Sequence, residues 1–223
     1  MTILASDLTK RLARTLHDIT KVRWPEDEMY ESIDDAQKAL LEARPDMFEV
    51  TEPVQMILGP KQPVPADCYS LFDLAYNLSA DMDPISTVTK VERPLMDRAV
   101  THWMSEPSDT QVDHWMQSER EREFFWVYPP VGEDPETSQP GWVEMRYARR
   151  PGIISGPGTE LGVTDEGING VYYFAMMRLL EKDEKFAGSP QAEMFLTKFG
   201  LVVGAKTEGE KQTQQIRETE ETA

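Results

Sequence analysis

The spacing of apolar residues changes twice along this chain, and this change constrains its fold more than any other feature. Near both ends, large apolar residues recur at intervals of three and four, as on one face of an amphipathic helix. In the middle of the chain they alternate with polar residues, which is typical of strands with one buried face. The sequence therefore predicts a β-rich segment inserted between two helical segments.

Residues 1–46 are predicted to form two helices. Pro25 suits the first turn of the second helix, where its missing N–H is not needed, and residues 26–28 place negative charge at the positive end of the helix dipole. Pro45 marks the end of this helix, because the residue before a proline avoids the helical conformation. The apolar stripe of the first helix contains Leu8, Leu12, Leu16 and Ile19, and that of the second contains Met29, Ile33, Ala36, Leu40 and Ala43.

Residues 47–152 are predicted to form the β-rich insertion. Strand signals occur around residues 54–58, 85–91, 112–116, 124–128 and 143–147. Residues 67–77 fit either a helix or a strand, residues 94–103 fit a short helix, and Pro129-Pro130 is expected to stop the strand before it. Strands separated by turn signals predict an antiparallel sheet or a small sandwich. Helices and strands do not alternate, which argues against a doubly wound sheet.

Helical spacing returns in residues 163–205, where Ser189-Pro190 is a start signal for the last helix. Residues 149–162 are rich in glycine and proline and are expected to be a linker or an exposed loop. Residues 206–223 contain a single large apolar residue, Ile216, so alone they would be disordered or form a solvated helix that orders on a partner. The predicted fold is α+β: a four-helix bundle of the two terminal helix pairs, a β-rich insertion and an extended C-terminal tail.

The charge of the chain limits its partners. The sequence has 23 basic and 40 acidic residues, a net charge of −17, which disfavours general binding to nucleic acid or to anionic membranes. No apolar run approaches a signal peptide or a membrane span. These features are compatible with a soluble enzyme, a binding module or a subunit of an acidic assembly. The single cysteine, Cys68, excludes an intramolecular disulfide and predicts a reduced, intracellular site of synthesis.

The residues that could carry chemistry do not occur in the spacings that chemistry requires. His17, His102 and His114 lack zinc-site spacing. The aspartate pairs at 34–35 and 81–83 are interpreted as solvated surface charge, and residues 156–158 as a flexible turn rather than a phosphate cradle. Cys68 is expected to be a buried small apolar residue, not a nucleophile. We therefore predict no catalytic residue, no metal and no cofactor.

The aromatic residues gather in one part of the chain, around the predicted strands beside the prolines. An aromatic strand pair is more often part of a core than a ligand platform, and the neighbouring acidic residues argue against base stacking. The residues concerned are Phe124, Phe125, Trp126, Tyr128 and Trp142.

Several motifs follow one another over about residues 20–202. They are Val22-Arg23-Trp24-Pro25-Glu26-Asp27-Glu28; Ile33-x-x-Ala36-Gln37-x-Ala39 with Arg44-Pro45-Asp46; Val64-Pro65-Ala66-Asp67; Phe125-x-Val127-Tyr128-Pro129-Pro130; Val143-x-x-x-Tyr147; and Lys182-Asp183-x-Lys185-x-Ala187-Gly188. In this order they resemble the head-to-tail adaptor proteins of short-tailed bacteriophages, which are also called connector or head-completion proteins.

The resemblance implies a structural protein of the virion neck, assembled in the host cytoplasm, and no catalytic residues. Such adaptors form a ring, usually of twelve copies, below the portal protein and dock tail or nozzle proteins. Genomic DNA passes through the ring without specific binding, and an acidic lumen would prevent the DNA from sticking. C-terminal segments of these proteins commonly reach along the portal. In this chain the corresponding residues would be Lys206, Lys211, Gln214, Ile216 and Arg217.

Two alternatives remain open from the sequence. The first is another phage neck or tail component, such as a stopper or a tail-tube subunit. The second is an enzyme whose site is dispersed along the sequence.

Overall fold

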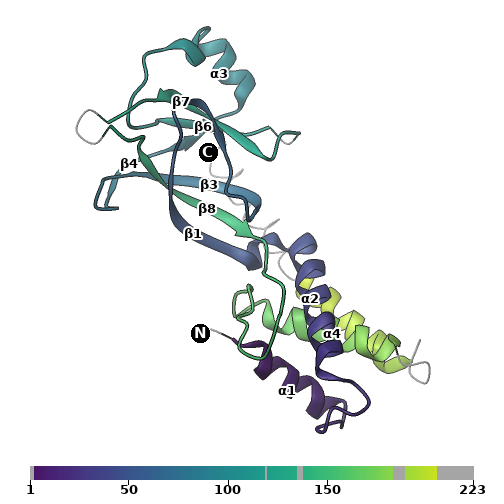
Figure 1. Cartoon of the computed structure of the whole chain (residues 1–223). Helices are drawn as coiled ribbons and strands as arrows, with labels where there is room; N and C mark the ends of the chain where they lie inside the picture. Colours follow the sequence, from purple (N-terminus) through teal and green to yellow (C-terminus); the bar gives the residue numbers. More distant parts are fainter. Residues whose placement is uncertain (1–2, 119, 135–137, 183–188, 205–223) are drawn as a thin grey trace. The chain divides into compact units, whose positions relative to one another are not determined.

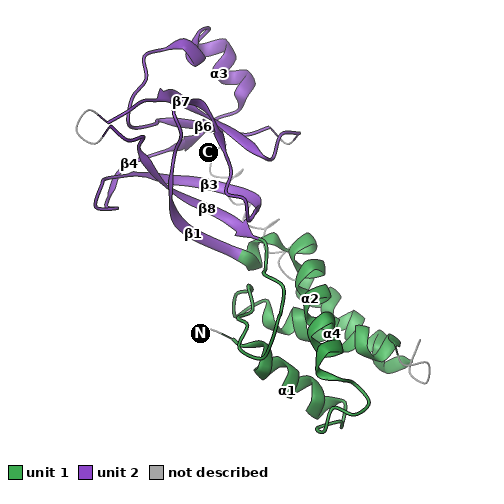
Figure 2. Cartoon of the chain, in the orientation of Figure 1, with its two compact units in different colours: residues 1–48, 150–223 green, residues 49–149 purple. Residues whose placement is uncertain are grey.

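The chain forms a helical unit and a β unit in the computed structural model, which describes residues 3–118, 120–134, 138–182 and 189–204 (Figure 1). The helical unit contains residues 1–48 and 150–223, and the β unit contains residues 49–149 (Figure 2). The predicted α+β class is confirmed. The insertion was expected at residues 47–152, and the helical pairs at residues 1–46 and 163–205.

The described part of the helical unit contains four α-helices. Three are labelled α1 (Ala5–Thr15), α2 (Glu26–Ala43) and α4 (Ile168–Lys182), and the fourth covers residues 190–204. The main contact is between α2 and α4, and α1 contacts both of them. Leu8 and Leu12 of α1 and Ile33 and Leu40 of α2 are buried, as the apolar spacing predicted. The last helix begins at residue 190, and Ser189 Oγ accepts a hydrogen bond from the backbone N–H of Ala192 at 3.3 Å.

The prediction that these helices form a four-helix bundle of two helix pairs is wrong. The beginning of α1 is held by irregular chain, because Ala5 N donates to Thr159 O at 2.8 Å and Leu161 N donates to Ile3 O at 2.9 Å. Most of the loop over residues 150–162 is exposed, as expected, but Ile154 and Leu161 are buried. The helix of residues 190–204 buries only Ala192 and Phe195. This unequal packing replaces the expected pair-on-pair arrangement.

The β unit contains two four-stranded sheets. The first has the order β1-β8-β3-β4 and is antiparallel throughout; the second has the order β2-β7-β6-β5, in which only β5 and β6 are parallel. The strands of the first sheet are β1 (Glu49–Gln55), β8 (Trp142–Arg149), β3 (Cys68–Leu78) and β4 (Pro84–Thr87). Those of the second are β2 (Gly59–Pro63), β7 (Phe124–Val131), β6 (His114–Met116) and β5 (Thr89–Lys90).

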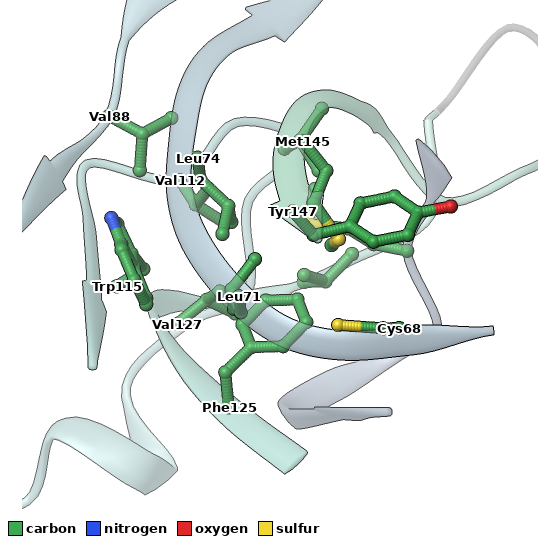
Figure 3. Close-up of a cluster of buried hydrophobic side chains, with 13 residues drawn as sticks. Cys68, Leu71, Leu74, Val88, Val112, Trp115, Phe125, Val127, Met145 and Tyr147 are labelled. Atoms are coloured by element: carbon green, nitrogen blue, oxygen red, sulfur yellow. The ribbon is translucent and has the colours of Figure 1, made fainter. Parts of the chain in front are cut away.

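The core of the β unit lies between the sheets (Figure 3). It contains Leu71 and Leu74 from β3, Trp115 from β6, Phe125 and Val127 from β7, and Val143, Met145 and Tyr147 from β8. A smaller cluster under α3 (Arg93–Ala99) and the short helix η2 (Trp103–Ser105) contains Met96, Trp103, Met116 and Trp126. The β unit is therefore a sandwich with one face of its second sheet covered by helices. Another short helix, η1 (Pro45–Phe48), belongs to the helical unit.

Two strand predictions need correction. The stretch of residues 85–91 is two strands, β4 and β5, which join different sheets and leave the buried Val88 between them. Pro129-Pro130 does not stop β7, which continues to Val131. The register of β2 against β7 shifts between Gly59 and Lys61, which pair with Val131 and Trp126. The prolines thus fall where β2 makes no ladder pair, so their missing N–H groups remove none of its hydrogen bonds.

Candidate functional site

The connection between α1 and α2, which we call the α1–α2 turn (residues 16–24), is fixed by one carboxylate. The side chain of Asp18 accepts hydrogen bonds from the backbone N–H groups of Val22 at 3.1 Å, Arg23 at 2.8 Å and Trp24 at 3.0 Å. His17 and Lys21 adopt left-handed backbone conformations, with φ of 54° and 55°. The indole N–H of Trp24 donates to Leu179 O of α4 at 3.3 Å. The turn is therefore anchored at both its centre and its end.

The hydrogen bonds from Trp24, Arg23 and Val22 hold the pKa of the Asp18 carboxyl below its usual range, against the opposing effect of burial. We expect this turn to lose stability in acid. As the pH falls below about 4, the unfolded chain takes up the proton before the folded chain, so folding becomes less favourable. Asp18→Asn keeps an acceptor oxygen but cannot titrate.

Urea unfolding from pH 5 to pH 2 measures this effect. The midpoint of Asp18→Asn should fall less steeply with pH than that of the unmodified chain. Asp81→Asn, at an exposed position in the β3–β4 turn, is the matched control and should follow the unmodified chain. Identical slopes for Asp18→Asn and the unmodified chain would contradict the role given to this carboxylate.

The α1–α2 turn displays two apolar side chains to solvent. Ile19 is 75% exposed and Val22 is 81% exposed. The sequence placed Ile19 on the buried stripe of the first helix, but α1 ends at Thr15 and Ile19 lies in the turn. Because the backbone of the turn is fixed, these two branched apolar side chains are held outward, where a partner protein could bury them.

An apolar groove lies beside this turn in the helical unit. It has a volume of about 360 Å³ and is formed by α1, the α1–α2 turn, α4 and the helix of residues 190–204. Cations stand near aromatic rings around it: the Arg11 guanidinium lies 3.8 Å from the ring centroid of Tyr172, and Lys198 Nζ lies 5.5 Å from that of Phe195. Its lining residues are Thr15, Leu16, His17, Trp24, Met176, Leu180, Gln191, Met194 and Phe195.

A second groove in the helical unit, between α2 and α4, is acidic. It has a volume of about 380 Å³ and is lined by Glu28, Glu31, Ser32, Asp35, Arg178, Leu179, Glu181 and Lys182. Both cations in this lining are paired: Arg178 Nη2 lies 3.0 Å from Asp35 and Lys182 Nζ lies 2.9 Å from Glu28. Glu31 and Glu181 are exposed at its surface. We call it the acidic groove.

The β unit contains a cluster of four titratable side chains: Glu52, Asp67, Tyr147 and Arg149. The Tyr147 hydroxyl donates to Glu52 and lies 3.2 Å from Asp67, while Arg149 donates to Glu52 and has its Nε 2.7 Å from Asp67. Burial and the hydrogen bond to Glu52 raise the pKa of the Tyr147 phenol. Burial by itself would raise the pKa of the Glu52 carboxyl, but the hydrogen bonds from Tyr147 and Arg149 outweigh this effect and lower the pKa. The phenol thus stays a hydrogen-bond donor that links β1 and β8.

Tyr147→Phe is expected to lower the free energy of unfolding by about 1–2 kcal/mol, because it removes the donor to a partly buried carboxylate and leaves the ring in the core. Chemical denaturation measures the change. Tyr76→Phe, on β3 and 39% exposed, is the matched control and should change the free energy of unfolding by less than about 0.5 kcal/mol. Equal effects at the two positions would show that the Tyr147 hydroxyl does not stabilise the fold.

The other residues that the sequence singled out lie in different settings. His17 lines the apolar groove, and the His114 ring stacks on Tyr128 with 6.3 Å between centroids. Cys68 is buried, as predicted. Asp34 accepts the N–H of Ile154 at 3.0 Å, and Asp35 pairs with Arg178. Among the residues that the structure describes, no group of three or more His, Cys, Asp or Glu side chains could hold a metal ion.

Lys206, Lys211, Gln214, Ile216 and Arg217, expected to contact the portal, lie outside the described residues. The sequence did not indicate Asp18 or the two grooves. Within the described ranges, no helix has the length and apolar character needed to cross a bilayer. No protein-family model matches the chain, and a search of curated proteins gives no match either.

Proposed function

We propose that this chain is a structural protein of the bacteriophage neck, a head-to-tail adaptor that acts by assembly rather than by catalysis. Its partners would be the portal protein, a tail or nozzle protein and further copies of itself in a ring, by resemblance a ring of twelve. Assembly would take place in the host cytoplasm, and the finished ring would form part of the DNA conduit of the virion. The order in which the sequence motifs follow one another over residues 20–202 supports this proposal.

The observation that carries the proposal is the exposed apolar pair on the fixed α1–α2 turn. Association of proteins is opposed by the loss of side-chain and loop freedom. A turn already held by three hydrogen bonds to Asp18 loses little further freedom when a partner covers it. Most of the hydrophobic free energy gained by burying Ile19 and Val22 would therefore stabilise the assembly, because little of it is offset by ordering the turn.

The acidic composition is consistent with a subunit that surrounds DNA. The β unit contains 18 acidic and 8 basic residues, so the negative charge is not confined to the C-terminal tail. Like charge on the wall of a conduit would keep passing phosphates from binding. The same charge also favours solubility, so it supports the proposal only together with the apolar turn.

Negative-stain microscopy tests the proposal. The full chain is mixed with the portal protein encoded in the same genome, and rings attached to the portal are the expected result. A chain that stays monomeric and ignores the portal would refute the adaptor function, while binding to tail proteins alone would favour a stopper or tail-tube subunit.

Deleting residues 206–223 should weaken binding to the portal and leave the midpoint of urea unfolding of the chain unchanged. Unchanged portal affinity would show that Lys206, Lys211, Gln214, Ile216 and Arg217 are not the portal contact.

A further inference from the structure

We propose that the α1–α2 turn of one copy docks into the acidic groove of the next copy and makes the head-to-tail contact of the ring. This inference rests on the proposed function, because it assigns the surfaces through which the copies of an adaptor would meet. The turn and the acidic groove would then each be covered by a neighbouring copy of the same chain.

The turn and the end of α1 form a basic surface in an otherwise acidic chain. Five cations occur within residues 10–23: Lys10, Arg11, Arg14, Lys21 and Arg23. All but Lys21 are exposed, and Lys21 is half-buried. Two of these cations are paired, Lys10 with Asp7 at 3.4 Å and Lys21 with Glu26. Asp18, the one acidic residue within residues 10–23, is occupied by the backbone of the turn. Residues 10–23 thus contain five basic residues and one acidic residue, so Ile19 and Val22 project from a segment of net positive charge.

The acidic groove has the complementary character. Helix α2 contains seven acidic residues and one lysine, and it forms one wall of the groove. Arg178 and Lys182 are already paired with Asp35 and Glu28, so Glu31 and Glu181 add negative charge at its surface. Leu179 and Ser32 provide uncharged lining between these carboxylates. A cavity of about 380 Å³ can receive branched side chains while its carboxylates face the surrounding cations.

Charge also decides between the two grooves of the helical unit. The apolar groove shares Leu16, His17 and Trp24 with the turn itself, so docking there would place the cations of two turns side by side. Like charges brought together at an interface disfavour association. The acidic groove avoids this repulsion. Because turn and groove are different surfaces, the contact is heterologous, and repeating it closes a ring if the rotation between copies fits.

A pair of engineered cysteines tests the contact directly. The chain carrying both Val22→Cys and Glu31→Cys is oxidised under mild conditions in the presence of the portal protein and run on a non-reducing gel. We expect a ladder of covalent dimers, trimers and larger species. Each variant with only one of the two added cysteines should run as a monomer on the same gel. Cys68, which is buried, stays in place in all of these variants. Dimers of the Val22→Cys variant alone would show a two-fold contact and overturn the proposal.

Charge reversal gives an independent test. Arg14→Glu and Glu31→Lys should each reduce assembly at least about tenfold, and the double variant should recover most of it. Rings without a cysteine ladder would overturn this contact and leave the adaptor function standing. A ladder without portal binding would overturn the adaptor function and support the contact. Absence of both rings and ladder would overturn both proposals.

Discussion

Replacing Ile19 and Val22 together by serine is expected to weaken assembly of the chain by about 100-fold or more and to leave its fold unchanged. The two side chains are 75% and 81% exposed, so the isolated chain gains little stability from them. Complete burial of an isoleucine or valine side chain contributes about 1.5–3 kcal/mol. Loss of both contacts removes at least about 3 kcal/mol, which corresponds to about two powers of ten in affinity.

Sedimentation velocity over a concentration series, with the portal protein present, measures this loss of assembly. The matched control is Ile153→Ser, because Ile153 lies in the same helical unit and is 78% exposed. We expect the control to assemble like the unmodified chain. Serine at positions 19 and 22 leaves the backbone N–H of Val22 free to donate to Asp18, so the turn itself should persist. Wild-type assembly by the double variant would eliminate this turn as an interface.

The same turn shows what apolar spacing cannot predict, which is the residue at which a helix ends. Intervals of three and four located the buried face of α1 and α2, and the two prolines correctly bounded α2. The stripe also continued through Ile19, but α1 ends at Thr15. An aspartate side chain that accepts backbone N–H groups offers the chain an alternative to further helix. Asp18 makes three such bonds, and a pattern of apolar residues contains no information about them.

The apolar stripe of a helix also does not indicate which part of the chain packs against it. The stripes showed that the terminal helices each bury one face, and a bundle of two helix pairs was the simplest way to cover them. The structure instead uses loop residues such as Ile154 and Leu161, which lie in a stretch without periodicity. The four-helix prediction failed because the partner of a buried face is set by contacts between distant residues.

Within the β unit, the dense aromatic run in β7 and the alternation in β8 predicted the two strands, yet these patterns could not predict how strands are ordered or distributed between sheets. Residues 85–91 look continuous, but β4 pairs with β3 while β5 pairs with β6. The two grooves are even harder to predict from the sequence, because each combines residues from α4 with residues more than 140 positions earlier. Spacing along the chain cannot bring such residues together.

Phe125→Ala is expected to destabilise the β unit by about 3–5 kcal/mol. Phe125 is 1% exposed and lies between the two sheets, in a cluster with Leu71, Trp115 and Tyr147 (Figure 3). Truncating a buried aromatic ring to a methyl group removes its transfer free energy and leaves a cavity that a packed core fills only in part. Since domains are stable by only about 5–15 kcal/mol, the variant would be close to unfolded.

Phe124→Ala, one residue earlier on β7, is the matched control for this prediction. Its ring is half-buried on the opposite face of the strand, where Lys61 Nζ lies 4.0 Å from the ring centroid. The control removes a ring of the same size but opens no cavity between the sheets, so we expect a loss of about 1–2 kcal/mol. Urea unfolding followed by tryptophan fluorescence measures both variants, because four of the five tryptophans lie in the β unit. Because neighbouring strand residues point to opposite faces, equal losses at the two positions would mean that Phe125 does not face the core.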